Sequence, residues 1–228
     1  MQPIILLHGA LGSKDMMEPL TQTLHGSGQV LSFNFSGHGG APFPSTPFTI
    51  PLFAEEIRTY MNAHAIEKAH LFGYSMGGYA AMYLAQQHPE MVSSVITLAT
   101  KFYWDEQVAA KEVGMLNAEK IKQKLPAFAA ELEQRHQPND WTALLEKTKE
   151  LLLGLGKQNT LQVTDYTSIT TPTVLLLGDR DKMVSLEETV AVYKALPNAQ
   201  LGVLPGTPHP FEQVNVDMLS WFIRNRER

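Results

Sequence analysis

The stretch LFGYSMGGYAAMYLAQQHPE, residues 71–90, joins an apolar run to an alanine-rich helical pattern through a turn that contains one serine. Gly73 and Gly77 stand two residues on either side of Ser75. A strand-turn-helix connection this sharp forces its central residue into a strained conformation, and the flanking positions must lack side chains. The G-x-S-x-G pattern in this context indicates a nucleophile elbow. On its own, the pattern also fits a simple turn.

The composition fits one compact α/β domain. The chain has 228 residues, of which 44% are hydrophobic, enough to bury a sizeable core. Its 18 Lys and Arg residues against 23 Asp and Glu give a net charge of -5, so there is no basic field for nucleic acid. Cysteine is absent, which excludes disulfides, thiolate-bound zinc and a cysteine nucleophile.

The N-terminal sequence MQPIILLHGALGS has a short apolar run, IILL, with no positive charge before it. Such a run is too short for a signal peptide or a membrane span. We therefore expect a cytoplasmic protein with no membrane span. The sequence carries no signal for the oligomeric state.

Short apolar runs alternate with longer amphipathic stretches, which is the pattern of parallel strands joined by crossover helices. Expected strands cover residues 3–7, 29–35, 69–72, 92–98, 173–177 and 200–204. Expected helices cover residues 16–24, 52–63, 76–87, 185–195 and 216–225. The near-continuous apolarity of IILL, VITLA and TVLLL predicts strands that are buried on both faces.

Residues 102–168 break this alternation. They contain consecutive short amphipathic stretches separated by Gly, Asn and Pro, with no convincing strand. We expect a helical lid over the functional site, because insertions this long usually carry a role. The core domain would then comprise residues 1–101 and 169–228, with 102–168 as the lid. Helices that only pad one edge of the sheet are the alternative.

A nucleophilic serine needs a base, and the base needs an orienting acid. In LGVLPGTPHPFEQV, His209 follows the last expected strand and precedes the last helix. After the preceding strand, TVLLLGDRDKMV offers Asp179 and Asp181. The chain order of serine, aspartate and histidine is the order of the elbow mechanism.

Five motifs, LLHGALGS, FNFSGHGG, GYSMGG, LLGDRDKMV and GTPHPFEQV, resemble in order and spacing those of the α/β-hydrolase superfamily over nearly the whole chain. The chain is most similar to small lidded members, which include carboxylesterases, carbon-carbon bond hydrolases and related acyl-transfer enzymes. The resemblance implies a mostly parallel six-stranded sheet flanked by helices, with a helical lid inserted. The first strand here corresponds to the third of the family, so we expect no N-terminal antiparallel hairpin.

The resemblance also assigns residues. A G-x-x-D pattern after the strand-ending glycine implies Asp181 as the acid and leaves Asp179 as a loop-capping or salt-bridging residue. An oxyanion hole needs preorganised N–H donors, and Met76 offers one at the start of its helix, where free N–H groups and the helix dipole favour an anion. By resemblance, Ala10 is the other donor, with Leu11 as a lesser contributor.

Some features depart from the family. The usual arginine before Gly-His-Gly is absent at Ser36, and Pro208 and Pro210 flank His209 where a glycine usually precedes the histidine. His8 is expected to hold its loop. The other histidines are expected at the surface, in loops or at helix ends: His25, His38, His64, His70, His88 and His136.

No metal or cofactor is expected. The histidines show no metal-ligand helical spacing with a nearby carboxylate, and the glycine-rich loops lack a phosphate or dinucleotide fingerprint. Candidate pocket residues are Leu11, Phe102, Trp104 and Met183. Anchoring of the lid explains the two aromatic residues about as well.

The sequence thus predicts a serine hydrolase that cleaves a small-molecule carbonyl substrate, an ester or thioester of small to medium apolar acyl character, through an acyl-enzyme. Ser75, His209 and Asp181 form the expected triad. A carbon-carbon bond hydrolase or lyase on the same fold is the first alternative, since fold and triad do not separate these reactions. A non-catalytic ligand-binding receptor is the second.

Overall fold

The computed structural model describes residues 2–226, which form an α/β fold around one sheet. All pairings in the sheet are parallel, in the order β2-β1-β3-β4-β5-β6. The strands are β1 (Ile4–Leu7), β2 (Val30–Ser32), β3 (Ala69–Tyr74), β4 (Val92–Leu98), β5 (Thr173–Gly178) and β6 (Ala199–Leu204). The expected six-stranded parallel sheet is therefore confirmed, with no antiparallel hairpin in the described part of the chain.

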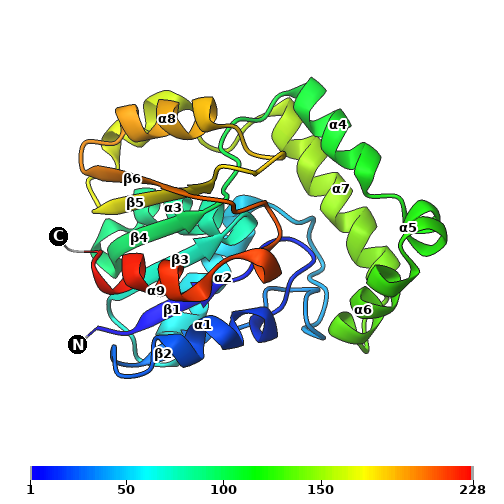
Figure 1. The fold of residues 1–228 in the computed structure, drawn as a ribbon, viewed down its shortest axis with the longest axis horizontal. Coiled ribbons are helices and arrows are strands. Elements are labelled where there is room, and N and C mark those ends of the chain that lie inside the picture. Colours follow the sequence, from blue (N-terminus) through cyan, green and yellow to red (C-terminus); the bar gives the residue numbers. More distant parts are fainter. Residues whose placement is uncertain (1, 227–228) are drawn as a thin grey trace.

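Helices surround the sheet. They are α1 (Glu18–Thr23), α2 (Ile50–Ala63), α3 (Met76–Gln87), α4 (Glu106–Met115), α5 (Ala118–Lys124), α6 (Pro126–His136), α7 (Trp141–Lys157), α8 (Leu186–Ala195) and α9 (Val216–Arg224). Short 3-10 turns are η1 (Lys14–Met17), η2 (Pro89–Met91), η3 (Val163–Ser168) and η4 (Phe211–Gln213). In Figure 1, α4–α7 lie together beyond one end of the sheet, and both chain ends lie at the other.

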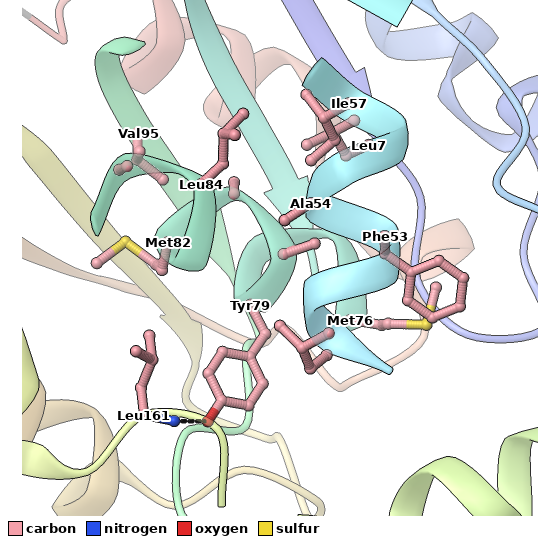
Figure 2. Packing of buried hydrophobic residues seen from close by; sticks show 14 of the residues in the cluster. Leu7, Phe53, Ala54, Ile57, Met76, Tyr79, Met82, Leu84, Val95 and Leu161 are labelled. Carbon is pink, nitrogen blue, oxygen red and sulfur yellow. Dashed lines mark hydrogen bonds between the residues drawn. The ribbon is translucent and has the colours of Figure 1, made fainter. Parts of the chain in front are cut away.

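The sheet is covered on both faces because its strands are apolar on both faces. Ile5 and Leu7 of β1 belong to the core beneath α2 and α3, whereas Ile4 and Leu6 belong to the core beneath α1 and α9. All four side chains are fully buried. Successive side chains of a strand point to opposite faces, so a run without polar residues requires helices on each side. Figure 2 shows the face that α2 and α3 cover.

One strand is shorter than its sequence pattern predicts. The expected strand at 29–35 ends in the structure at Ser32. The Phe35 N–H donates to His8 Nε2 at 3.2 Å, so the chain has left the sheet by this point. The apolar residues beyond Ser32 pack inward from a loop, which period-two alternation cannot distinguish from a strand.

Residues 102–168 contain α4–α7 and η3, and no strand occurs there in the structure. The starts of three of these helices follow from capping: the side chains of Asp105, Asn117 and Asp140 each accept a backbone N–H from the first turn. Each cap satisfies a donor that has no partner within its helix.

The side chains of these helices pack into two hydrophobic clusters. Ile121, Leu132 and Leu145 belong to a small cluster formed among α5, α6 and the first half of α7. Leu151 and Leu155, from the second half of α7, belong to the main core. The second half of α7 therefore packs the helical segment against the core of the sheet.

The passage from β3 to α3 depends on glycine. A Cβ atom on Gly73 would lie 2.4 Å from Cα of Gly78. One on Gly77 would lie 2.6 Å from the carbonyl oxygens of Leu7 and His8. These distances are far inside van der Waals contact, and the obstructing atoms are backbone, which cannot rotate away.

Replacing Gly77 with Ala should therefore lower the free energy of unfolding by about 2 kcal/mol or more, because the sheet and α3 must move apart. Gly154→Ala in α7 is the control: a Cβ there meets nothing within 4 Å, and alanine in a helix interior stabilises by up to about 1 kcal/mol. Urea unfolding of both variants measures the difference. Equal stability of the two variants would contradict the close approach.

Candidate active site

Ser75 occupies the turn between β3 and α3 with φ 51° and ψ -116°, a conformation that is strained for a residue with a side chain. Its N–H donates to the Leu98 carbonyl at 2.9 Å. Its carbonyl accepts the Thr100 hydroxyl at 3.1 Å and the Gly78 N–H at 3.0 Å. These bonds to β4 and α3 hold the strained residue in place.

Asp181 and His209 lie on the loops after β5 and β6 and are hydrogen-bonded to each other. His209 Nδ1 donates to Asp181 Oδ2 at 2.8 Å. Asp181 Oδ1 accepts the N–H groups of Met183 at 2.8 Å and Val184 at 2.9 Å. Because Nδ1 carries the proton in this arrangement, Nε2 of the neutral ring is the nitrogen that can accept one.

The Asp181 carboxylate is almost completely covered, with its side chain 1% exposed. Burial alone raises its pKa, but the hydrogen bond and charge of His209 and the N–H groups of Val184 and Met183 outweigh burial and lower it. The carboxylate is therefore ionised at neutral pH and can stabilise a positively charged imidazole. Asp179 instead accepts the Thr207 N–H at 3.2 Å, a loop-closing contact.

Tyr74 supports the histidine loop from β3. Its hydroxyl donates to the His209 carbonyl at 3.0 Å, and the two rings lie 5.6 Å apart. Burial raises the pKa of the Tyr74 phenol, so it remains a protonated donor. This role was missed by sequence reasoning, although the residue directly precedes Ser75.

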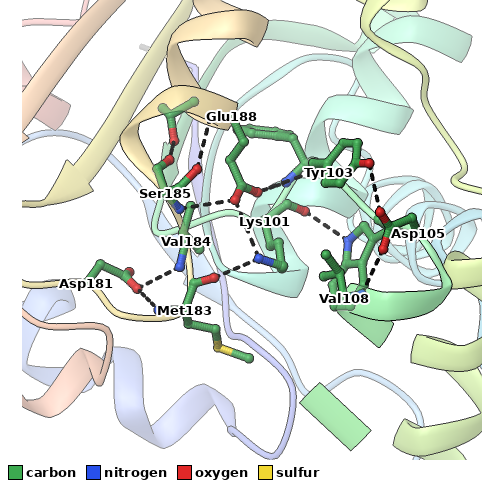
Figure 3. A network of polar contacts seen from close by, with 12 residues as sticks. Lys101, Tyr103, Asp105, Val108, Asp181, Met183, Val184, Ser185 and Glu188 are labelled. Carbon is green, nitrogen blue, oxygen red and sulfur yellow. Dashed lines mark hydrogen bonds and ion pairs between the residues drawn. The ribbon is translucent and has the colours of Figure 1, made fainter. Parts of the chain in front are cut away.

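A largely buried ion pair joins the loop after β4 to the first turn of α8 (Figure 3). Lys101 Nζ donates to the Met183 carbonyl at 2.7 Å and lies 3.4 Å from the Glu188 carboxylate. Glu188 also accepts the N–H groups of Phe102 and Tyr103 at 3.1 and 3.3 Å. The pair thus fixes the backbone of Met183, next to an amide that holds Asp181. Sequence reasoning missed both charged residues.

Ser75 and His209 line one cavity of about 200 Å³. The cavity is also lined by the predicted residues Ala10, Leu11, Met76, Trp104 and Met183. Apolar side chains from α7 complete much of the remaining wall, namely Leu151, Leu152 and Leu155. The structure thus brings together predicted residues from four of the five motifs, together with Trp104.

Phe102 is the exception among the predicted pocket residues. Its side chain is buried outside this cavity, with its ring 6.2 Å from that of Tyr79 and 5.6 Å from that of Tyr166. Its N–H donates to the Glu188 carboxylate at 3.1 Å. Phe102 therefore does not line the cavity that Ser75 and His209 share, and its contact with Tyr166 fits the alternative that it anchors the helical segment.

The loop after β1 is held by His8. Its Nδ1 donates to the Gly9 carbonyl at 2.8 Å, and its Nε2 accepts the Phe35 N–H. Burial lowers its pKa to about 4, so the ring is neutral at physiological pH. Both nitrogens are occupied, which agrees with a loop-holding role. Leu11 in the same loop has a φ of 60°, so the chain turns sharply beside Ala10.

The last residues of α6 form hydrogen bonds with this loop. The Leu11 carbonyl accepts Arg135 Nη1 and His136 Nε2, each at 3.0 Å. His136 Nδ1 accepts the Gly39 N–H at 3.0 Å. The helical segment is thereby bonded to two loops at the carboxyl edge of the sheet.

Three histidine rings gather at this junction. The His38 ring lies 5.2 Å from that of His8 and 6.0 Å from that of His136, and all three side chains are fully buried. Burial lowers the pKa of His136 to about 4 and that of His38 well below its ordinary value. The sequence suggested a loop and a helix end for these residues but not their burial. His70, inside β3, is also buried and bonds to Ser94, contrary to expectation.

These depressed pKa values predict acid sensitivity. Unfolded histidine binds a proton near pH 6.5, whereas folded His8 and His136 do so near pH 4. Stability is therefore complete above the unfolded pKa and falls as the pH drops from 6.5 towards 4, by up to about 3 kcal/mol for each residue. Urea unfolding at about pH 7.5 and about pH 5 measures the loss.

His136→Asn should lose less stability between these two pH values than the parent protein. His25 is exposed in the loop after α1 and provides the control variant His25→Asn, which should match the parent. An equal loss in His136→Asn would show that His136 is not held neutral.

Within residues 2–226, no group of three or more His, Asp or Glu side chains is arranged to hold a metal ion. In the same range, no helix combines the length and apolarity that crossing a membrane requires.

The chain is similar to known proteins in sequence and in structure. A 2-(acetamidomethylene)succinate hydrolase of Mesorhizobium japonicum is 24% identical over 245 residues, which cover 97% of this chain and 86% of that protein. A pimeloyl-(acyl-carrier protein) methyl ester esterase of Neisseria meningitidis serogroup B is 34% identical over 97 residues, 42% of this chain and 36% of that one. The crystal structure of the enol-lactonase from Burkholderia xenovorans LB400 shares the fold, with a TM-score of 0.80 at 17% identity over 99% of this chain and 90% of that chain.

A family comparison covers most of the chain. Residues 2–154 match the family described as the alpha/beta hydrolase fold. The match runs from β1 through the turn at Ser75 and into α7. The chain therefore belongs to the α/β-hydrolase family and is a hydrolase of that family.

Proposed function

We propose that this hydrolase cleaves an ester or thioester of a small, mainly apolar acyl compound through a serine nucleophile. The observation that supports this proposal most directly is the 2.8 Å hydrogen bond from His209 Nδ1 to the buried Asp181 carboxylate. His209 and Ser75 line the same cavity. A histidine oriented in this way is a base for a neighbouring hydroxyl. The methyl ester esterase among the relatives supports ester cleavage.

In the first half-reaction, Ser75 Oγ attacks the substrate carbonyl carbon while His209 Nε2 takes the hydroxyl proton. The carbonyl oxygen becomes an oxyanion, which the N–H groups of Ala10 and Met76 stabilise. Asp181 remains ionised and stabilises the imidazolium. The intermediate then collapses: the carbon–oxygen or carbon–sulfur bond breaks, the leaving alkoxide or thiolate takes the proton from His209, and an acyl ester of Ser75 remains.

In the second half-reaction, a water molecule attacks the acyl ester and His209 accepts its proton. The Ser75 alkoxide leaves the second tetrahedral intermediate and recovers that proton, which releases the carboxylic acid. Met76 suits the oxyanion role because it is the first residue of α3, where an N–H has no partner within the helix and the dipole favours negative charge.

Residues 102–168 act as the lid in this proposal, above a core formed by residues 1–101 and 169–228. Supporting this division, Trp104 and the leucines of α7 line the cavity above Ser75. Such a cover excludes water and selects the acyl group. The size and apolar lining of the cavity favour a small acyl group.

Ser75→Ala should lower kcat/KM for a short-chain p-nitrophenyl ester by at least about a thousandfold, because the nucleophile is lost. Asp181→Asn should cost about as much, because the imidazole loses its charged partner and its correct tautomer. Initial rates with purified variants, checked for folding by circular dichroism, give these values.

Asp179→Asn is the matched control, since this aspartate lies in the same loop and contacts Thr207 rather than the histidine. It should retain nearly full activity. Full activity in Ser75→Ala, or equal losses in both aspartate variants, would overturn the assignment. Turnover of a 1,3-diketone with no activity on any ester would favour carbon-carbon cleavage instead.

A further inference from the structure

The cavity beside Ser75 is lined by a carboxyl group with one buried oxygen that has no hydrogen-bond partner in the described part of the chain. Glu112, on α4, lines the cavity and is 1% exposed. Its Oε2 atom is buried and has no hydrogen-bond partner. Residues 2–226 contain other buried side-chain atoms without a hydrogen-bond partner, but Glu112 is the one residue among them that lines this cavity.

Two other polar side chains that line the cavity, Lys101 and Thr148, are hydrogen-bonded within the protein. Lys101 is bonded to the Met183 carbonyl and paired with Glu188. The Thr148 hydroxyl donates to the Leu144 carbonyl at 2.8 Å. Lys101 is paired directly with Glu188, whereas Glu112 has no direct ion pair in residues 2–226, and the charges of Lys101, Lys111 and His209 act on it without a direct contact.

A buried carboxyl oxygen without a hydrogen bond lowers the free energy of unfolding. A carboxyl without hydrogen bonds in an apolar wall destabilises the fold, and an apolar side chain of similar size would pack better. Burial also raises the pKa of Glu112, while the charge of Lys101 opposes the shift. A group that is unsatisfied in the empty cavity becomes satisfied if a bound molecule supplies a donor.

We infer that Glu112 determines the specificity of this cavity by accepting a hydrogen bond from a hydroxyl or N–H group on the substrate. The inference rests on the proposed function and narrows its substrate class. The apolar leucines of α7 share the wall with Glu112 and Ser75. The substrate is therefore a short acyl compound whose apolar chain separates the reacting carbonyl from one hydrogen-bond donor.

Acyl chains that end in a carboxylate are disfavoured by the same arrangement. The cavity offers such a group no unpaired cation, because Lys101 is already paired with Glu188. A carboxylate placed near Glu112 would repel its ionised form. A hydroxyl or an ammonium group meets an acceptor there.

A comparison of matched p-nitrophenyl esters tests the inference. Plain, ω-hydroxy, ω-amino and ω-carboxy acyl chains from pentanoyl to octanoyl are compared by kcat/KM. The parent protein should prefer a donor-bearing ester over its plain counterpart by about tenfold or more, because a site built to bind a donor rejects an analogue without one. The ω-carboxy esters should be the poorest.

Three variants test whether Glu112 causes the preference for donor-bearing esters. Glu112→Leu should remove the preference and improve turnover of plain esters, whereas Glu112→Gln should retain a preference for hydroxyl and lose one for ammonium. Exposed Glu106, on the same helix, provides the control variant Glu106→Gln, whose preference should equal that of the parent. The ratio between substrates within one variant does not respond to a uniform loss of folded enzyme.

A stability measurement separates a substrate-binding role from a structural one. Glu112→Leu should raise the urea midpoint of unfolding, because it removes an unsatisfied buried group. A lowered midpoint, or Ser75-dependent hydrolysis with no preference for donor-bearing esters, would overturn the inference and leave the proposed function standing. No turnover of any ester by the parent protein would reject both.

Discussion

The structure depends on one close approach, where β3 passes into α3 with no room for a side chain on either side of Ser75. Gly73 and Gly77 permit that approach, and the backbone of Ser75 is strained as a result. The turn places the serine at the carboxyl edge of a parallel sheet, and it places the first N–H groups of α3 beside the same cavity. Reaching these positions with a less crowded turn would move the helix away from the sheet. In the proposed mechanism, the nucleophile and one oxyanion donor both follow from this constraint.

The loops around the serine are connected to one another rather than held separately. Tyr74 binds the His209 carbonyl, and the Lys101–Glu188 pair fixes the backbone next to Asp181. On the opposite side, His136 bonds α6 to the loop at Leu11. The helices over the cavity therefore contact the loop that carries Ala10, one of the two proposed oxyanion donors. Hydrogen bonds across several strands thus set the geometry that the proposed reaction needs.

Local signals in the sequence predicted much of this arrangement. Apolar runs gave the six strands, and the glycines of the turn gave the start of α3. The order of the motifs gave an acid before the histidine, and the resemblance to the α/β-hydrolase superfamily selected Asp181 over Asp179. Properties that depend on long-range packing were not predictable. Lys101 and Glu188 meet because β4 and β5 are neighbours, and His136 meets His38 because α6 returns to the sheet. Glu112 belongs to a helix with three charged residues, and no periodicity indicated that, of these three, it is the one that lines the cavity. Phe102 looked like a pocket residue because it adjoins Trp104, but its ring packs against Tyr79 and Tyr166, which are distant in the sequence.

The central claim is that Ser75 is an activated nucleophile beside preorganised N–H donors. Intact-mass analysis after exposure to a fluorophosphonate probe, followed by peptide mapping, tests it most directly, because the probe reacts with a serine only where a base and an oxyanion site act together. The account predicts one covalent adduct, located on Ser75 and absent from Ser75→Ala. An unmodified protein, or an adduct at another residue that persists in Ser75→Ala, would contradict it.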